Sequence, residues 1–499
     1  MTEFASRECL SFGDALFLYL EREGMPLNVA SISTFDGVVP LKSCREFVET
    51  KLHLVPRYRQ RVVAPPLNIG LPSWEYDPHF DIRNHIREAR LRGGTDAEFR
   101  ALVAEILSAT MDRSRPLWDF TLVQGLQRGR TGLIVRVHHC LADGISGVGL
   151  MKAVLDESPD VRRGTVKPER VPVSRPLDTT TQVMDGVVTA CLSAVQRVLT
   201  AHSEMLAFAQ QLAHVNGAGS NGAHSNHALP ASKAAPEELT RFLPELAAAP
   251  ARLPFNMVCR GPQKFQWAEI PFAEIREVKR ACDATVNDVI LTVVTSAIRR
   301  YCQAHGVDVR KKFLRIIVPV SIRTQDESAE LGNRLTFLPV PIPFGARSPR
   351  KLLAAVHERT MFLKNFRVAE MVGFAGTLVG LVPTAVQAML GPLASSLPIS
   401  VGNLICTNVP GPQQALYLLG HQMLTCHPYV PIGGEFGLNC AVLTYNGTAY
   451  FGFSGDAQAA PDIHHLRRYT RESFAELKAD AALAGRPRLK RVALAAVGG

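Results

Sequence analysis

The chain has 499 residues and a formal net charge of +10, and 46% of its residues are apolar. One hydrophobic core rarely grows beyond about 250 to 300 residues, so this length predicts two domains of about 200 to 250 residues. The positive charge favours an anionic partner, such as a phosphate-rich cofactor or an anionic lipid surface. We expect no nucleic acid partner, because no nucleic-acid-binding motif occurs and only 7% of the residues are aromatic.

The cysteines and the N-terminus both indicate a location inside the cell. The ten cysteines are scattered without a Cys-x-x-Cys pair, which is typical of reduced thiols in the cytosol. Residues 1–13 include Glu3, Arg7 and Glu8 and contain no long apolar run, so we expect no signal peptide.

The first half of the chain alternates helical and strand-like patterns. In chain order these are a helix at 101–111, a strand at 132–139 and a helix at 145–155. A mostly apolar helical run at 181–215 then leads to residues 216–232, which are mainly Gly, Asn, Ala, Ser and His. That segment has too few apolar residues to fold by itself and is predicted to be a flexible linker.

The second half repeats this alternation. The patterns predict a strand at 264–270, helices at 272–282 and 287–305, and an apolar strand at 314–320. We therefore divide the chain into an N-terminal domain of residues 1–176, a helical and flexible linker of residues 177–252, and a C-terminal domain of residues 253–499.

Residues 371–434 contain no Asp, Glu, Lys or Arg. The most apolar window, 372–397, is interrupted by Pro383, Gly391 and Pro392, whereas a membrane-spanning helix needs about 20 consecutive apolar residues. We therefore expect a buried or interfacial hairpin in this stretch rather than a bilayer crossing.

The strongest candidate site is the run His138-His139-Cys140-Leu141-Ala142-Asp143-Gly144, which follows the apolar strand. A histidine titrates near neutral pH, so a neutral imidazole can accept a proton from an attacking hydroxyl and later return it. Successive residues of a strand point to opposite faces, so only one of the two histidines can face a given cavity.

Two other interpretations of this run stay open. A metal site would use the same imidazole and carboxylate groups, but the His-Glu-x-x-His spacing and a nearby Cys-rich partner are missing, so we predict no metal. A structural, hydrogen-bonded histidine pair is the second alternative. The chain contains another such pair, His464-His465, in a helical pattern where solvated histidines are expected.

The run 138–144 resembles the signature of the bacterial wax ester synthase/acyl-CoA:diacylglycerol acyltransferase family, which includes triacylglycerol synthases. The resemblance covers the chain apart from the linker and the C-terminal tail. Cys140 stands where this family has a small apolar residue. The other matching elements are Leu10-Ser11 with Asp14 and Phe17, Pro116-Leu117-Trp118 followed by Asp119, Asn287-Asp288, Pro319-Val320-Ser321-Ile322-Arg323 with Gly332-Asn333, and Asn408-Val409-Pro410-Gly411-Pro412.

The resemblance implies an α/β fold of two chloramphenicol-acetyltransferase-like (CoA-dependent acyltransferase) domains. Each domain would have a mixed sheet with flanking helices, and the active site would lie at their interface. The implied activity transfers a long-chain acyl group from acyl-CoA to the hydroxyl of diacylglycerol or of a fatty alcohol, which makes triacylglycerol or wax ester. Acyl-CoA is a co-substrate, and no cofactor is expected.

The resemblance also suggests roles for the residues of the run. His139 is the candidate general base, with no acyl-enzyme intermediate, and His138 is expected to support the loop. Asp143 either orients His139 or pairs with Arg323 from the other domain and holds the turn. Gly144 leaves space for substrate against the backbone.

Asn287 has two possible roles at its helix start. It could donate a hydrogen bond to the oxyanion of the tetrahedral intermediate, or it could be the N-cap of the helix, a position that Asn favours. Asp288 is expected to be a first-turn acid that complements the helix dipole.

Two of the matching elements, Pro116-Leu117-Trp118 and residues 408–412, are expected to contribute to stability more than to catalysis. Trp118 is predicted to be a core aromatic residue, and residues 408–412 are predicted to form a turn.

Basic residues cluster at 162–175 and 486–491 and could bind anionic lipid headgroups. With the uncharged stretch 371–434, they suggest a cytoplasmic protein bound peripherally to the inner face of the plasma membrane or to lipid inclusions.

Two rival functions stay open. A condensation-type acyltransferase acting on carrier-protein thioesters shares the His-His-x-x-x-Asp-Gly run, although no carrier attachment signature occurs in the chain. A non-catalytic protein of lipid inclusions is the rival from another class. The sequence does not distinguish diacylglycerol from fatty alcohol as the preferred acceptor.

Overall fold

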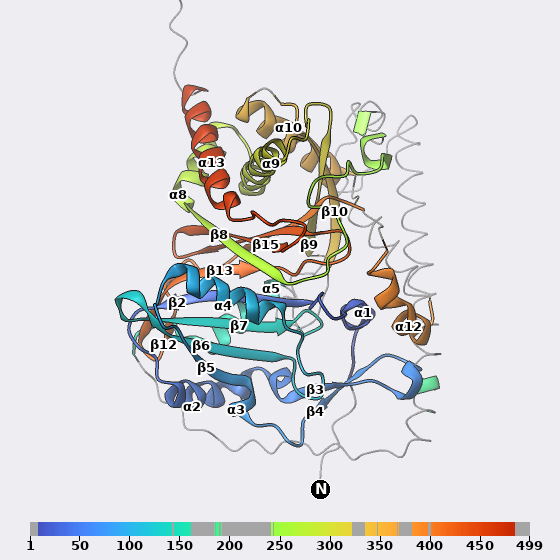
Figure 1. Ribbon diagram of the computed structural model, residues 1–499, viewed down its shortest axis with the longest axis vertical. Coiled ribbons are helices and arrows are strands. Elements are labelled where there is room, and N and C mark those ends of the chain that lie inside the picture. Colours follow the sequence, from blue (N-terminus) through green and yellow to red (C-terminus); the bar gives the residue numbers. More distant parts are fainter. Residues whose placement is uncertain are drawn as a thin grey trace, which may run out of the picture.

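The computed structural model describes residues 8–141, 144–160, 184, 186–188, 191, 241–242, 244–321, 335–346, 348–366, 368, 382–397 and 401–484. In this part the chain forms two six-stranded sheets, which lie one above the other in Figure 1 with helices on their outer sides. The fold is a mixed-sheet α/β fold, as expected.

The first sheet lies in the lower half of Figure 1 and has the strand order β12-β13-β2-β7-β6-β5. Strands β5 and β6 run parallel and the other neighbours run antiparallel, so the sheet is mixed. In this order the strands are β12 (Tyr417–Leu418), β13 (His421–Tyr429), β2 (Asn28–Phe35), β7 (Arg130–His138), β6 (Trp118–Leu126) and β5 (Ile86–Arg90).

The second sheet has the order β10-β9-β11-β14-β15-β8, and β9, β11 and β14 run parallel. Its strands are β10 (Leu335–Pro343), β9 (Phe313–Ser321), β11 (Leu404–Pro410), β14 (Leu438–Tyr445), β15 (Thr448–Asp456) and β8 (Gln263–Pro271). A small third sheet joins β1 (Glu8–Cys9), β4 (Ser73–Tyr76) and β3 (Gln60–Val63).

Helices flank the large sheets, most of them on the outer sides. In the lower half they are α1 (Phe12–Leu20), α2 (Leu41–Lys51), α3 (Ile82–His85), α4 (Asp96–Ser108) and α5 (Gly144–Val154), with short 3-10 turns η1 (Leu52–Leu54), η2 (Pro56–Arg59), η3 (Pro66–Asn68) and η4 (Gln127–Gly129). In the upper half they are α8 (Phe272–Ala281), α9 (Val286–Ala304), α10 (Pro349–Asn365) and α13 (His465–Ala484), and α12 (Thr384–Ala394) packs beside α1.

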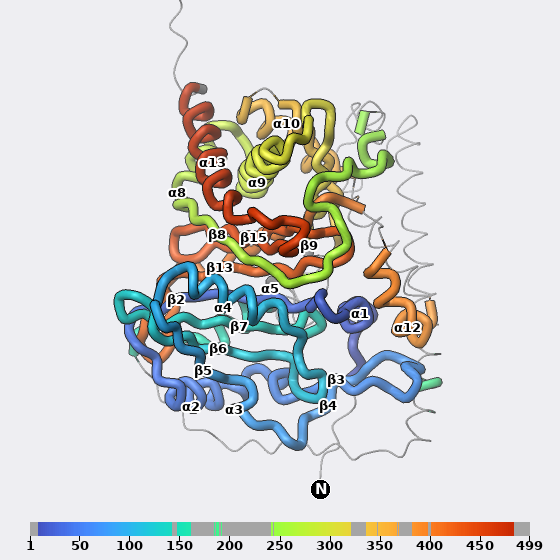
Figure 2. The backbone as a smooth tube through the Cα atoms, in the orientation of Figure 1, coloured from blue at the N-terminus to red at the C-terminus, as the bar shows by residue number. Residues whose placement is uncertain are grey.

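Two strands of the second half, β12 and β13, belong to the first sheet. Strand β13 follows the second-half strand β11 in the chain, yet it pairs antiparallel with β2 and so extends the first sheet. Figure 2 shows this exchange as an orange segment beside blue ones. A strand pattern in the sequence gives no information about which sheet the strand joins, so the division by chain order did not predict this exchange.

Most predicted elements are confirmed within two residues. The strand predicted at 132–139 is β7 (Arg130–His138), and the helix predicted at 287–305 is α9 (Val286–Ala304). The helix predicted at 101–111 begins five residues earlier, at Asp96, because the side chain of Thr95 caps it by accepting a hydrogen bond from the Glu98 amide.

Residues 371–381 and 398–400 lie outside the described residues, so the hairpin expected in the uncharged stretch 371–434 is tested only for residues 382–397 and 401–434. These residues form α12 and then strands β11, β12 and β13, which belong to two different sheets. Strands β12 and β13 form a largely buried antiparallel hairpin within this stretch, whereas α12 exposes apolar side chains. Within the described ranges, no single helix has both the length and the apolar composition for a membrane span, although the bent pair α8 and α9 meets these criteria together.

Candidate active site

A cavity of about 770 Å³ lies between the two sheets and holds the side chain of His139. Its walls come from both halves of the chain, because His139 follows β7 and Asn287 lies in α9. Most of the wall is apolar, so the cavity suits an aliphatic ligand. Representative apolar residues are Val29, Val137 and Met151 from the first half and Val318, Phe337 and Val409 from the second.

The two histidines have the different environments that strand alternation predicts. His138 is the last residue of β7, and its side chain is fully buried. His139 is half-buried and lines the cavity. Of the pair, His139 is therefore the histidine that a substrate in the cavity can reach.

The ring of His139 is held in one orientation. It stacks on Phe17 of α1, with ring centroids 3.9 Å apart and an angle of 4° between the planes. The His139 backbone N–H donates to the carbonyl oxygen of Leu27 at 2.9 Å. Phe17 also lines the cavity, so the N-terminal element Leu10-Ser11…Asp14…Phe17 contributes directly to the site. Within that element Ser11 caps α1 by accepting from the amide of Asp14.

The hydrogen bonds of His138 define its tautomer. The Cys140 backbone N–H donates to Nδ1 of His138 at 3.1 Å, so Nδ1 acts as an acceptor and carries no proton. The proton of a neutral ring then resides on Nε2, which faces Oε1 of Glu21 at 3.4 Å. His138 therefore shapes the turn after β7 and does not face the cavity.

Glu21 connects the surroundings of both histidines. It directly follows α1, its side chain is buried, and its Oε2 accepts from Nη2 of Arg113 at 2.8 Å. Its Oε1 accepts from the amide of Leu27 at 3.0 Å, and Leu27 in turn accepts from the His139 amide.

The charge of Glu21 is stabilised in the folded protein. Burial by itself raises the pKa of this carboxyl group, but the His138 and Arg113 side chains outweigh burial and lower the pKa from 4.5 to about 2. No pattern in the sequence identifies Glu21, because it is a single acidic residue whose partner Arg113 lies 92 positions away.

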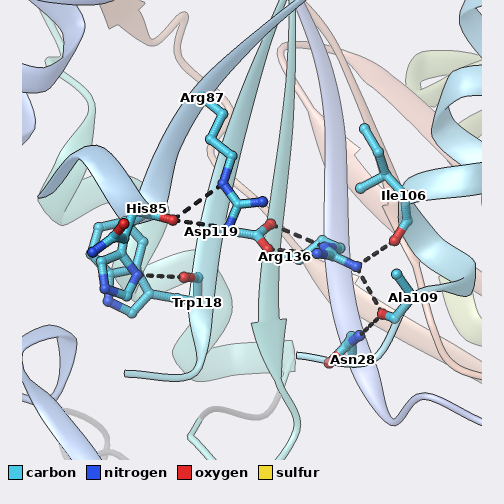
Figure 3. Close-up of polar contacts among 9 residues, drawn as sticks. Asn28, His85, Arg87, Ile106, Ala109, Trp118, Asp119 and Arg136 are labelled. Carbon is cyan, nitrogen blue, oxygen red and sulfur yellow. Dashed lines mark hydrogen bonds and ion pairs between the residues drawn. The ribbon is translucent and has the colours of Figure 1, made fainter. Parts of the chain in front are cut away.

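A buried ion pair fixes the strand that carries the histidines. Asp119 and Arg136 face each other on β6 and β7, with Nε–Oδ1 and Nη2–Oδ2 distances of 3.0 and 2.5 Å (Figure 3). Arg136 also donates to the carbonyl oxygen of Ala109, which accepts from Asn28 as well. Arg136, which pairs with the acidic residue after the Pro-Leu-Trp element, therefore ties β7 to the C-terminus of α4, two residues before His138.

Trp118 is the core aromatic residue that the sequence predicts. Its side chain is buried, and its indole N–H donates to the carbonyl oxygen of Tyr58 at 2.8 Å. The ring stacks between Tyr58 and His85, at centroid distances of 4.4 and 4.5 Å. Figure 3 shows the hydrogen bond between Nδ1 of His85 and the carbonyl oxygen of Trp118. Trp118 therefore anchors the start of β6 in a cluster of aromatic rings.

Asn287 is not the N-cap of α9, so that interpretation is wrong. The cap is Thr285, which forms a reciprocal capping box with Asp288. Asn287 instead lies in the first helical turn and lines the cavity. The Thr-x-x-Asp spacing in the sequence could have identified Thr285 as the cap.

Asp288 is a first-turn acid, as predicted, and it also connects α9 to α10. Its carboxylate contacts Nδ1 of His357 at 2.7 Å and accepts from the hydroxyl of Thr360 at 2.7 Å. Burial raises its pKa, but these contacts and the Thr285 amide outweigh burial and leave the pKa lowered.

The turn predicted at 408–412 is only partly correct. Asn408, Val409 and Pro410 are the last three residues of strand β11, and all three line the cavity. The Pro-Gly pair identifies the end of the strand, but the residues before it form the cavity wall. Residues 408–410 therefore contribute to the candidate active site, whereas the sequence predicted only a stabilising turn.

The remaining predicted site residues are only partly described. Gly144 is the first residue of α5. Asp143 and Arg323 lie outside the described residues, so their pairing stays a prediction. In the part of the chain that the structure describes, no group of three His, Cys, Asp or Glu side chains is placed to hold a metal ion.

Two family models match the chain. The model of the wax ester synthase/diacylglycerol acyltransferase catalytic domain matches residues 10–290, and that of the WS/DGAT C-terminal domain matches residues 331–478. A relative from Mycobacterium tuberculosis, named probable diacylglycerol O-acyltransferase tgs1, is 27% identical over 490 residues, which cover 93% of this chain and 95% of the relative.

Solved structures share the fold. The wax ester synthase/diacylglycerol acyltransferase from Marinobacter aquaeolei VT8 aligns with a TM-score of 0.63 and 22% identity, covering 95% of this chain and all of that one. The first condensation domain of the calcium-dependent antibiotic synthetase aligns with a TM-score of 0.58 and 16% identity, over 96% and 98% of the two chains. At these identities the likeness concerns the fold alone.

Proposed function

Because the chain belongs to the wax ester synthase/diacylglycerol acyltransferase family, we propose that it esterifies lipid hydroxyl groups with long-chain acyl groups from acyl-CoA. The acceptor is diacylglycerol, and fatty alcohols are further acceptors. The observation that carries this proposal is the position of His139, a titratable side chain in a largely apolar cavity between the two sheets. The cavity suits aliphatic chains, and the imidazole supplies the proton transfer that the chemistry needs.

His139 acts as the general base. It accepts the proton of the acceptor hydroxyl while the hydroxyl oxygen forms a bond to the thioester carbonyl carbon. The tetrahedral intermediate then collapses as the carbon–sulfur bond breaks, and His139 returns the proton to the departing CoA thiolate. No acyl-enzyme forms. General-base assistance of this kind is typically worth about 10²- to 10⁴-fold in rate.

His138 supports the turn and does not act as the base. Its Nδ1 accepts from the Cys140 amide, and its Nε2 faces Glu21 in a buried site. Neither nitrogen is available to a substrate in the cavity.

Asn287 stabilises the oxyanion of the intermediate. Its side chain lies on the wall that the second half contributes, while His139 comes from the first half. The acyl thioester would bind between them, with its carbonyl oxygen toward the amide donor. Donors placed in this way are typically worth about 10²- to 10³-fold in rate.

Asp143 and Arg323 form an interdomain ion pair that holds the turn after His139. A charge-paired carboxylate is less costly to bury than an isolated one, which favours this structural role over direct catalysis. This part of the proposal comes from the family resemblance.

A condensation-type activity on carrier-protein thioesters is less well supported. The condensation domains share the fold at 16% identity or lower, whereas both matching family models are those of the wax ester synthase/diacylglycerol acyltransferase family. Acceptors of this family are lipids, so the protein would work at the cytoplasmic surface of the plasma membrane or of lipid inclusions.

The test supplies purified protein with labelled palmitoyl-CoA and, in parallel, diacylglycerol and hexadecanol. Triacylglycerol and wax ester are the expected products, and their ratio gives the acceptor preference. His139→Ala should abolish both products, whereas His464→Ala, which replaces an exposed histidine, should leave both unchanged. Equal turnover by His139→Ala would remove the proposed base.

A further inference from the structure

Helix α12 buries its polar face and exposes its apolar face, which is the reverse of an ordinary surface helix. Its buried stripe consists of small or polar residues, namely Thr384, Gln387, Gly391 and the following Ser395. Its exposed face is apolar. Together with Leu67 of η3 that face forms the α12 patch, which consists of Leu67, Val386, Met389, Leu390, Leu393 and Leu397.

The patch is well exposed. Leu67, Met389 and Leu393 have exposed fractions of 80%, 70% and 58%. Leu67 is also held in the left-handed backbone region, with φ of 55°, which is unfavourable for a leucine. A contiguous apolar surface of this kind marks a site of interaction with another apolar surface.

The buried side of α12 is packed against the first half of the chain. A β-carbon at Gly391 would collide with the carbonyl oxygen of Tyr19 in α1, so the two helices lie in close contact. The hydroxyl of Thr384 donates to the carbonyl oxygen of Asn68 at 2.8 Å and accepts from the Gly70 amide at 3.1 Å. These contacts leave the apolar face of α12 exposed. The helix itself lies on the right side of Figure 1, beside α1.

The C-terminal end of α12 reaches the candidate active site. Ala394 and Ser395 line the cavity that contains His139, and Ala394 is itself exposed. The α12 patch is therefore continuous with the cavity wall. A membrane held at this patch would lie beside the wall of the cavity that a lipid acceptor has to enter.

We propose that the α12 patch is the surface by which the protein docks on a phospholipid membrane, with the exposed side chains inserted among the acyl chains. The delivery of acceptor to His139 rests on the proposed function, whereas the docking itself does not. Residues 382–397 contain no Asp, Glu, Lys or Arg, so this docking is driven by burial of apolar side chains and not by headgroup charge.

The test measures co-sedimentation of the full chain with phosphatidylcholine vesicles at low and at high salt. The wild-type protein should bind under both conditions and without anionic lipid. Met389→Glu and Leu393→Glu should each lower the partition coefficient roughly tenfold, since burial of one such side chain has about that effect on an equilibrium. The matched control is Leu483→Glu, which replaces a 65% exposed leucine of α13 and should bind normally. Helix α13 lies on the opposite side of Figure 1 from α12.

Three results would contradict the proposal that the α12 patch docks on a membrane. The first is wild-type sedimentation of both α12 variants. The second is binding that requires phosphatidylglycerol and disappears at high salt, which would assign docking to basic segments. The third is a wild-type dimer that Met389→Glu converts to a monomer with unchanged vesicle binding, which would assign the patch to a second copy of the chain.

An activity assay separates this inference from the proposed function. With palmitoyl-CoA and water-soluble hexanol, Met389→Glu and Leu393→Glu should keep wild-type turnover, but with vesicle-borne diacylglycerol they should lose it in proportion to binding. Vesicle binding by a wild-type protein that lacks transferase activity would refute the proposed function and leave the docking surface intact.

Discussion

Nε2 of His138 lies 3.4 Å from Oε1 of Glu21, and this contact connects the histidine pair to the end of α1. The same oxygen accepts from the Leu27 amide, and the carbonyl oxygen of Leu27 accepts from the His139 amide. Glu21 therefore positions both sides of the turn without facing the cavity, and it is a positioning residue rather than a catalytic one.

Glu21→Gln should destabilise the protein at neutral pH. The pKa of Glu21 falls from 4.5 to about 2 on folding, so its charge stabilises the folded state by on the order of 3 kcal/mol. Because the folded pKa is the lower one, this stabilisation is complete above pH 4.5 and is lost as the pH falls toward 2. Urea denaturation of wild type and variant should therefore give a difference that is constant from pH 7 to pH 5 and shrinks below.

The matched control for this prediction is Glu23→Gln, which replaces an exposed carboxylate two residues away. It should leave the free energy of unfolding unchanged at every pH. A Glu21→Gln variant that is equally stable at pH 7, or a difference that grows as the pH falls, would contradict the assigned role of Glu21.

The sequence predicted the part of the site that lies in one continuous segment. The run from His138 to Gly144 and the alternation of its two histidines are local features, so they were accessible without coordinates. The contacts of Phe17 and Glu21 were not, because they depend on how α1 packs against the end of β7. Packing between distant segments leaves no periodic pattern in a single sequence.

The same reasoning applies to the fold. The helix α9 and the strand β7 follow from apolar periodicity and were predicted within two residues. The placement of β13 beside β2 in the first sheet was not predicted, because hydrogen bonding between strands uses backbone groups that every residue has. The exposure of the apolar face of α12 could not be predicted for a further reason. Apolar periodicity identifies the two faces of a helix but does not show which face is buried.

Substitutions at Asn287 and at Thr285 should have different effects, the first on catalysis and the second on stability. Asn287→Ala should lower kcat about 10²- to 10³-fold with little change in melting temperature, because it removes an oxyanion donor. Thr285→Ala should cost about 1 kcal/mol of stability, because it removes the N-cap, while kcat stays near wild type. Steady-state kinetics and thermal denaturation of both variants test this, and the opposite pattern would make Asn287 structural.

Removing the charge of one partner of the Asp119–Arg136 pair should lower the stability of the protein more than removing both charges. Both side chains are buried, so Asp119→Asn leaves an uncompensated guanidinium and should lower stability by about 3 to 5 kcal/mol. The double variant Asp119→Leu/Arg136→Met removes both charges and should recover much of this loss. Urea denaturation of the single and double variants measures the difference. A double variant less stable than Asp119→Asn would show that Arg136 acts mainly through its contact with Ala109.

Phe17→Leu should impair catalysis more than folding. The leucine keeps most of the apolar volume but removes the stacked ring that holds His139, and a small displacement of a reacting group can cost about 10²-fold in rate. We expect a lower kcat with a nearly unchanged KM for acyl-CoA. The control is Phe313→Leu, an exposed phenylalanine at the start of β9, which should keep wild-type kinetics. A higher KM with wild-type kcat would instead assign Phe17 to substrate binding.

Charge reversal can test the proposed ion pair of Asp143 and Arg323. Asp143→Arg and Arg323→Asp should each lower the yield of soluble protein and the melting temperature, because each places like charges at one contact. The double reversal restores opposite charges and should recover part of both losses, whereas the exposed control Asp160→Arg should resemble wild type. A direct role in orienting His139 makes a different prediction: Asp143→Asn would be soluble and stable but inactive, and the double reversal would not restore activity. Melting temperature and turnover measured on the same preparations distinguish the two roles.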